Sequence, residues 1–315
     1  MVVKNNKKKI NKQRLKRYTW AYIFLIPQLV VFFGLSLYPI VMSYVYSFYD
    51  WNGIGPLDNF VGLDNFKKAL GSEIFWNAFK NTFIYTFGFV VISISVGLLL
   101  ALILNNPKLK GKTFYRTIFF LPVVATAAIL GIIMSNIFGS KGALNEILHM
   151  INVIDKAIPW LSSKDLAMVV LIIVGSWKEI GVIMIYWLAG LQMIPRDVYD
   201  AAYVDGAGFW QTLRHITLPL LAPVGGTILL LTTVSSMKVF DLVKTLTNGG
   251  PSRATETLEL FIYRTAFDPE SVSQVGYASS IGVILGMTVF LVSLLLGFLV
   301  YAVNKKRQNG EVKQQ

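Results

Sequence analysis

The sequence contains no cysteine and only two histidines, His149 and His215. Without cysteine the chain cannot form disulfides, thiolate metal sites or a cysteine nucleophile. No cluster of metal-ligating residue types is visible, and we therefore expect no metal site. Charged residues are also scarce, at 15% of 315 residues, whereas soluble domains carry roughly 25%. With 54% hydrophobic residues and a mean hydropathy of +0.57, this composition indicates a membrane protein.

Catalytic motifs are absent as well. The pattern Gly-x-x-x-x-Gly-Lys-Ser/Thr, whose backbone would cradle a nucleotide phosphate, does not occur. An intramembrane protease would need Ser with His, or paired Asp, inside membrane spans, and neither histidine lies in an expected span. We therefore expect that the chain is not an enzyme and carries no cofactor of its own.

Six apolar stretches are long enough to cross a bilayer, which takes about 20 residues. They occupy about 19–42, 81–104, 114–138, 166–190, 216–237 and 279–303. The first run is too long for a cleaved signal peptide and is expected to remain as a span. The sequence thus predicts an all-α membrane protein with a basic tail at 1–17, a membrane domain at 18–303 and a second tail at 304–315.

The orientation follows from the distribution of positive charge. Of the 29 Lys and Arg residues, 18 fall on the side that holds both chain ends, 10 fall on the other side, and Lys178 lies within a span. Both termini are therefore expected in the cytoplasm, together with the loop at 195–219. The net charge of +12 is concentrated in the tails, where it suits anionic lipid rather than nucleic acid.

The 195–219 loop is polar between two apolar stretches. Asp197 is a candidate N-cap, and Asp200, three residues later, a candidate for the acid of a capping box. Gly206 can adopt the left-handed conformation that ends a helix. A short amphipathic run follows and leads into the next span. We predict a helix, a sharp turn and a second helix, forming a knob that suits insertion into a groove on a partner protein.

This loop resembles one in the membrane subunits of binding-protein-dependent ABC importers. The shared pattern reads Asp200-Ala201-Ala202, Gly206, Ile216 and Leu218-Pro219, with Asp200 in place of the family's Glu. The resemblance implies that the loop docks into a separate cytoplasmic ATPase subunit and transmits its movement; the alternative is an ordinary cytoplasmic loop with a glycine turn. The expected coupling residues are Asp200, Ala201, Ala202, Asp205, Gly206, Ile216, Leu218 and Pro219.

A second set of motifs resembles the carbohydrate-uptake branch of the same family, in particular the multiple-sugar and glycerol-3-phosphate permeases. The motifs are Phe240-Asp241, the Thr247–Pro251 turn, Thr255-Glu-Thr-Leu258 and Tyr263–Phe267. The resemblance implies a type I ABC importer permease fold in a bacterial cytoplasmic membrane. The implied partners are a second permease subunit in a heterodimer, two copies of an ATPase that bind ATP and Mg, and an extracytoplasmic sugar-binding protein.

The fourth predicted span carries ionisable and aromatic residues that are candidates for a substrate pathway. Lys178 and Glu179 fall near its middle, where a charge is costly unless it faces water or a partner. Since adjacent helical residues point about 100° apart, we expect each to need its own partner rather than to pair. Trp177, Tyr186 and Trp187 offer faces for sugar rings, the alternative being that they fill gaps where Gly175 and Gly181 allow close packing.

Three other functions compete with the sugar permease. The cargo of an ABC permease is alternatively glycerol phosphate or a peptide. A stand-alone secondary transporter is a further alternative, although the sequence shows neither the internal repeats nor the broken helices that would favour it. An intramembrane enzyme is disfavoured by the missing catalytic residues.

Overall fold

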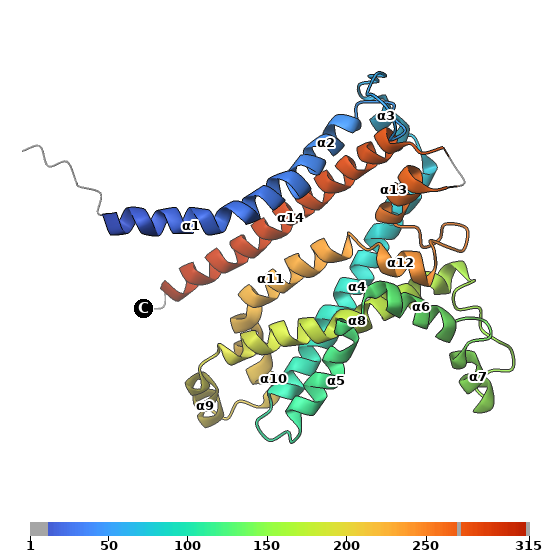
Figure 1. Ribbon diagram of the computed structural model, residues 1–315. Helices are drawn as coiled ribbons and strands as arrows, with labels where there is room; N and C mark the ends of the chain where they lie inside the picture. Colours follow the sequence, from blue (N-terminus) through green and yellow to red (C-terminus); the bar gives the residue numbers. More distant parts are fainter. Residues whose placement is uncertain (1–11, 270–271, 313–315) are drawn as a thin grey trace, which may run out of the picture.

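The computed structural model describes residues 12–269 and 272–312, and its regular elements in those ranges are helices (Figure 1). Residues 1–11 of the expected N-terminal tail and 313–315 of the C-terminal tail lie outside the described residues. The helices are α1 (Lys12–Val31), α2 (Tyr38–Tyr46), α3 (Asp64–Leu70), α4 (Glu73–Asn105), α5 (Lys112–Val124), α6 (Ala127–Ile137), α7 (Ala143–Met150), α8 (Lys164–Gln192), α9 (Arg196–Val204), α10 (Phe209–Thr212), α11 (Leu218–Ser236), α12 (Asp241–Leu246), α13 (Leu258–Phe267) and α14 (Val275–Val312). Two π-helical segments, Phe32–Leu37 and Leu213–Thr217, join α1 to α2 and α10 to α11.

Five helical stretches of the described chain are long and apolar enough to cross a membrane. They are Arg17–Tyr46, Glu73–Asn105, Lys164–Gln192, Phe209–Ser236 and Val275–Ala302. The bent pair α5 and α6 provides the sixth span when counted as one. The all-α fold with six spans is thereby confirmed. Several helices begin or end a few residues beyond the apolar runs, because helical hydrogen bonding continues past the last apolar residue.

The third span is not the continuous helix that the run 114–138 predicts. Helix α5 ends at Val124, α6 begins at Ala127, and the two axes differ by 96°. Ala125 is extended, and the Thr126 hydroxyl caps α6 by accepting a hydrogen bond of 3.4 Å from the Ile129 N–H. A residue that caps a new helix cannot continue the preceding one, and hydropathy alone does not detect such a break.

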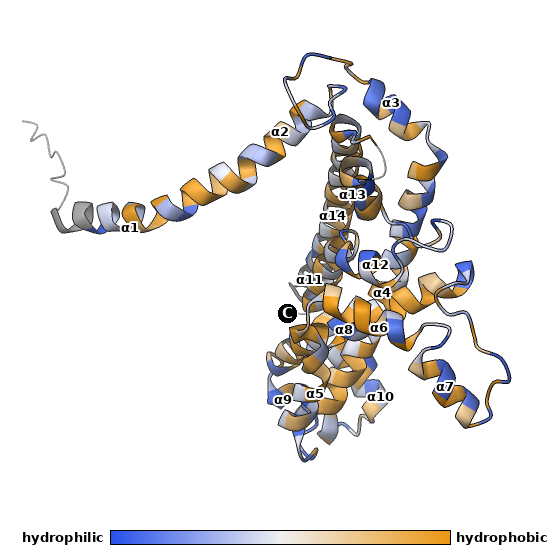
Figure 2. Ribbon diagram, turned by 45° about the vertical axis from the view of Figure 1, so that its right-hand side comes forward, coloured by the Kyte–Doolittle hydropathy of each residue, from blue (hydrophilic) through white to orange (hydrophobic). Residues whose placement is uncertain are grey.

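The first part of the first span, α1, stands apart from the rest of the molecule. In the most apolar part of Arg17–Tyr46 no residue is buried. Figures 1 and 2 show α1 running away from the bundle with hydrophobic residues along it, while α2 packs against α14. A long helix with apolar side chains on its whole circumference needs lipid or another membrane helix around it.

Much of the core lies where α4 and α8 pack along each other, and a further buried cluster joins α4 to α13 and α14. Glycines let the backbones approach: a Cβ at Gly97 would lie 2.7 Å from the Ile183 side chain, and one at Gly175 would lie 2.4 Å from the Tyr85 hydroxyl. At Gly181 a Cβ would lie 2.4 Å from the Phe119 carbonyl of α5. Small residues therefore set the spacing of α4, α5 and α8, as is common between membrane helices.

Candidate functional site

The 195–219 loop folds as two short helices around a glycine turn, as predicted. Gly206 has φ of +76°, its N–H donates to the Tyr203 carbonyl (3.1 Å), and the Ala207 N–H donates to the Ala202 carbonyl (2.9 Å). These two bonds form the left-handed C-terminal cap of α9. A Cβ at Gly206 would meet nothing within 4 Å. Glycine is thus favoured here by the backbone conformation and not by packing inside the chain.

The predicted N-cap of α9 is wrong. The helix begins at Arg196 after Pro195, and no side chain caps it. Asp197 lies in the first turn, where its negative charge interacts favourably with the positive end of the helix dipole. Asp200 lies in the middle of the helix and is exposed. Pro195 takes the N-cap position with an extended backbone, two residues earlier than the acidic pattern suggests.

A cap that the sequence interpretation missed lies at the second helix. The Gln211 side-chain oxygen accepts a 3.0 Å hydrogen bond from the Gly208 N–H. The signal is present in the sequence, since Gln three residues after a helix-starting residue is the second half of a capping box. This bond fixes the start of α10 directly after the Gly206 turn.

The turn exposes large apolar side chains. Val204 is 84% exposed, and Tyr203, Phe209 and Trp210 beside it are also exposed. Of the expected coupling residues, Asp200, Ala201, Asp205, Gly206, Leu218 and Pro219 are exposed, Ile216 is half-buried and Ala202 is buried. A compact surface of apolar side chains with an acidic rim is typical of a protein contact.

The loop is continuous with a membrane span. Helix α10, the π-helical segment Leu213–Thr217 and α11 form one helical run of 28 residues, Phe209–Ser236. The Thr217 hydroxyl is 3.4 Å from the Tyr199 hydroxyl, which ties α9 to the base of this run. The second helix of the loop is therefore joined to α11 without a break in the helical run.

Lys178 and Glu179 of α8 form an ion pair, with Nζ and Oε1 2.6 Å apart. The expectation that they do not pair is wrong, because long side chains can bend around the helix to meet even when their Cβ atoms diverge. The Lys178 side chain is 14% exposed and that of Glu179 38%. The carboxylate is thus the more accessible half of the pair.

The three aromatic candidates of α8 do not share one face. Trp187 is 6% exposed and packs against Gly225 in the core between α8 and α11. Trp177 and Tyr186 are both exposed, but nine residues separate them, which places them on opposite sides of the helix. Tyr186 follows Glu179 by seven residues, and these two share a face.

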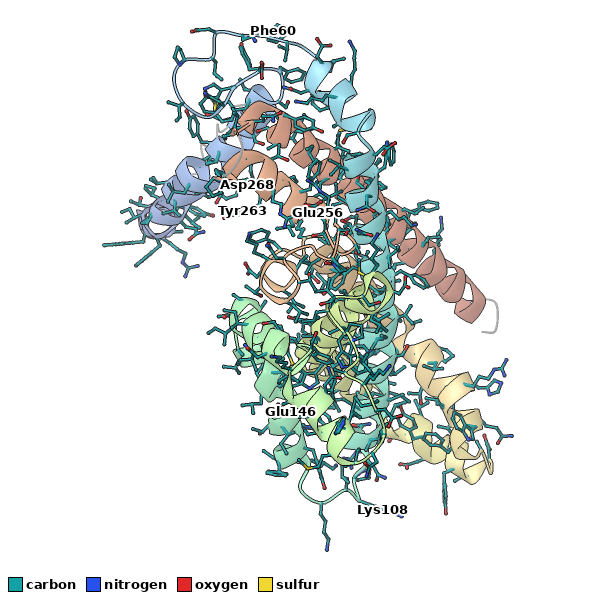
Figure 3. The ribbon with its side chains drawn as sticks, turned by 90° about the vertical axis from the view of Figure 1, so that its right-hand side faces the viewer. Phe60, Lys108, Glu146, Glu256, Tyr263 and Asp268 are labelled. Atoms are coloured by element: carbon teal, nitrogen blue, oxygen red, sulfur yellow. The ribbon has the colours of Figure 1, made fainter. Side chains whose placement is uncertain are left out.

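The carbohydrate-branch motifs build a buried ion-pair cluster around Glu256, which Figure 3 places between the end that carries Phe60 and the end that carries Lys108. Glu256 is fully buried and pairs with Arg253 Nη1 at 3.0 Å and Arg264 Nη1 at 2.7 Å. The Asn81 amide of α4 donates to the carbonyls of Arg253 and Glu256, both at 3.1 Å. The Leu258 N–H donates to the Thr82 hydroxyl at 3.0 Å. The motif residues therefore join α13 to α4.

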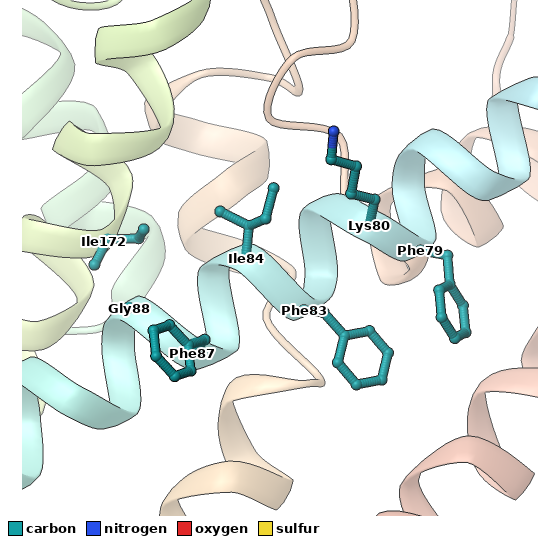
Figure 4. Close-up of a pocket in the computed structure, with 7 residues that line it drawn as sticks. All are labelled: Phe79, Lys80, Phe83, Ile84, Phe87, Gly88 and Ile172. Carbon is teal, nitrogen blue, oxygen red and sulfur yellow. The ribbon is translucent and has the colours of Figure 1, made fainter.

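An apolar groove of ≈ 560 Å³ follows α4. Figure 4 shows Phe79, Phe83 and Phe87 on one side of the helix and Lys80 on the opposite side. The three rings recur every four residues and form a stripe in which Phe87 is exposed, whereas Phe79 and Phe83 are half-buried and pack against the core around Phe75. Such a stripe suits contact with lipid or with another membrane helix.

Comparison with known proteins agrees with the geometry. Residues 93–309 match the family described as "Binding-protein-dependent transport system inner membrane component". The chain is 34% identical over 289 residues to the lactose transport system permease protein LacF of Rhizobium radiobacter, covering 90% of this chain and 96% of that one. It is 31% identical over 276 residues to the multiple sugar-binding transport system permease protein MsmF of Streptococcus mutans, covering 88% and 93%.

Among solved structures, a bacterial ABC transporter involved in the import of the acidic polysaccharide alginate has a chain with the same fold. The TM-score is 0.79 at 23% sequence identity, with 92% of this chain and 98% of that chain covered. Together, the family match, the relatives and the fold show that this chain belongs to the inner-membrane components of binding-protein-dependent transport systems.

Proposed function

We propose that this chain is the membrane-spanning permease subunit of an ATP-driven importer for a sugar or oligosaccharide delivered by an extracytoplasmic binding protein. Curated relatives named for lactose, arabinooligosaccharide and multiple-sugar transport support the cargo class. The observation that carries the proposal is the exposed 195–219 loop, whose glycine turn and apolar tip are continuous with α11.

In this proposal the loop receives its movement from a separate ATPase. The tip around Val204 enters a groove of the ATPase, and Asp200 and Asp205 lie at the rim of the contact. Two ATPase copies bind ATP and Mg and close on ATP binding. ATP shifts the equilibrium between the open and the closed ATPase only through its different affinity for these two states. For this shift to reach the permease, the loop must fit the open and the closed ATPase differently.

A second permease completes the membrane part. The unburied first span, Arg17–Tyr46, leaves an apolar surface that lipid or a partner helix would cover. Both termini and the 195–219 loop face the cytoplasm. The connections that carry Phe60 and Lys108 lie at opposite ends of the molecule (Figure 3), as this orientation requires.

The sugar passes along the exposed face of α8 that holds Glu179 and Tyr186. The Glu179 carboxylate accepts hydrogen bonds from sugar hydroxyls, and the Tyr186 ring covers an apolar sugar face. The Lys178 ammonium, 2.6 Å from the carboxylate, holds it in position. Trp177 lies on the opposite side of α8 from Glu179 and Tyr186. It therefore contacts the sugar only if the sugar pathway passes around this helix.

Reconstitution tests the cargo and the energy source together. The chain, its partner permease and the ATPase are placed in proteoliposomes with the binding protein outside and ATP inside. Labelled mono- and oligosaccharides, glycerol phosphate and a peptide are offered in turn. We expect uptake of a saccharide that requires both ATP and the binding protein. Uptake of glycerol phosphate or peptide alone would favour the alternative cargo, and uptake without the ATPase would favour a stand-alone transporter.

A further inference from the structure

A cavity of ≈ 890 Å³ lies beside the 195–219 loop. It is enclosed by the ends of α4, α5 and α8 on one side and by α9 and α10 on the other. Small-molecule sites typically measure roughly 300–1,000 Å³. The cavity is therefore large enough to hold a whole ligand rather than one inserted side chain.

The lining of the cavity is positively charged. Lys112, Arg116 and Arg196 contribute cations, and Asp200 contributes a carboxylate. The ion pairs formed within residues 12–269 and 272–312 involve none of these four side chains. Arg116 Nε is buried and has no hydrogen-bond partner in the described part of the chain. An unpaired buried donor of a charged group is costly, so the site is complete only with an acceptor in place.

Two of the cations occupy positions that the helices themselves disfavour. Lys112 is the first residue of α5 and Arg196 the first residue of α9. A helix N-terminus carries partial positive charge and is stabilised by anions, not by cations. Both positions become favourable when an anion lies between the two helix starts.

The remaining lining residues indicate the kind of anion. The amides of Asn105 and Gln192 offer donors to oxygen, and Leu102, Leu191 and Leu213 add an apolar wall. Guanidinium and ammonium groups together suit the several oxygens of a phosphate. An apolar wall beside a basic pocket at the end of membrane helices suits the glycerol and acyl part of a lipid.

We propose that this cavity binds a phosphate group that bridges α5 and α9, supplied by the head group of an anionic phospholipid. Free phosphate offers the same chemistry and is the other possible source. The bound group joins Lys112 and Arg116 of the bundle to Arg196 of the loop and so stabilises the position of the loop. The site is independent of which sugar is carried, so its failure would leave the proposed function untouched.

The test uses the purified complex of this chain with its partner subunits. Native mass spectrometry measures retained phosphatidylglycerol and phosphatidylcholine, and thermal unfolding measures stabilisation by inorganic phosphate. Lys112→Gln/Arg116→Gln is compared with Lys108→Gln/Lys110→Gln, which removes the same charge from exposed residues of the same connection that do not line the cavity. Because charge-assisted contacts are lost, we expect phosphatidylglycerol retention about tenfold lower in the first variant and unchanged in the second.

The outcomes separate the sources. Selective loss of phosphatidylglycerol supports the lipid, and stabilisation by inorganic phosphate that only Lys112→Gln/Arg116→Gln abolishes supports free phosphate. Equal retention in both double variants, or equal retention of phosphatidylcholine, overturns the proposal. So does an intact complex that binds neither probe. If Lys112→Gln/Arg116→Gln does not assemble, Arg196→Gln at the exposed helix start replaces it, and unchanged binding there overturns the proposal.

Discussion

At the scale of single residues, Gly206 decides the shape of the 195–219 loop. Its φ of +76° is open to glycine and costs other residues about 1–2 kcal/mol, Asn being the residue that adopts it most readily. Nothing within 4 Å opposes a side chain there. Any effect of a substitution therefore comes from the backbone turn or from the surface that the partner meets.

Gly206→Ala is expected to leave the subunit in the membrane but to reduce ATPase co-purification and coupled sugar uptake several-fold, and Gly206→Leu to reduce both further. Gly206→Asn should retain more activity than either, since Asn adopts left-handed φ. Gly208→Ala is the matched control: its φ is −73°, and its Cβ would meet only Gln211 Oε1 at 3.9 Å. Wild-type uptake and full ATPase retention in Gly206→Leu would contradict the coupling role.

The pathway on α8 is tested with single cysteines, because the chain has none of its own. We expect Glu179→Cys and Tyr186→Cys, which share a face, to react with small aqueous thiol reagents at rates that change with ATP. Leu188→Cys, buried on the same helix at 4% exposure, is the control and should remain unreactive. Inert cysteines at 179 and 186 in every nucleotide state would place the pathway elsewhere.

At the scale of elements, long apolar runs were enough to predict α4, α8, α11 and α14 from the sequence. The break between α5 and α6 was not predictable from hydropathy, because apolar residues continue on both sides of it and the break depends on the Thr126 cap. The start of α9 was placed two residues late, because the Asp pattern outweighed Pro195. The Lys178–Glu179 pair was missed because Cβ directions do not constrain the ends of long side chains.

The buried ion-pair cluster around Glu256, which joins α13 to α4, is expected to stabilise the fold. Glu256→Gln leaves Arg264 without its charged partner, and removing one member of a buried pair costs about 3–5 kcal/mol. We expect a lower unfolding temperature of the purified complex. Asp64→Asn breaks the exposed pair with Lys67 and is the control, for which we expect little change. Equal unfolding temperatures for the two variants would show that the ion-pair cluster around Glu256 does not stabilise the fold.

At the scale of the whole molecule, the proposed contact with a cytoplasmic ATPase requires a fixed orientation of the chain in the membrane. The distribution of Lys and Arg predicts cytoplasmic termini and an outer position for the 247–257 segment. Reporter fusions after Gln315 and Gly249 should report the cytoplasm and the exterior respectively. The reverse result would place the 195–219 loop on the side where no ATP is available and would overturn the proposed coupling.

A contact between the tip of the 195–219 loop and a cytoplasmic ATPase can be measured directly, because the chain contains no cysteine. A photo-crosslinker is attached to Val204→Cys, which is 84% exposed at the tip, or to Ile54→Cys, which is 83% exposed in the expected outer loop. The assembled complex is then irradiated with and without ATP. We predict a permease–ATPase adduct from Val204 alone, in a yield that changes with ATP. An adduct from Ile54, or none from Val204 in a complex that retains its ATPase, would contradict the account.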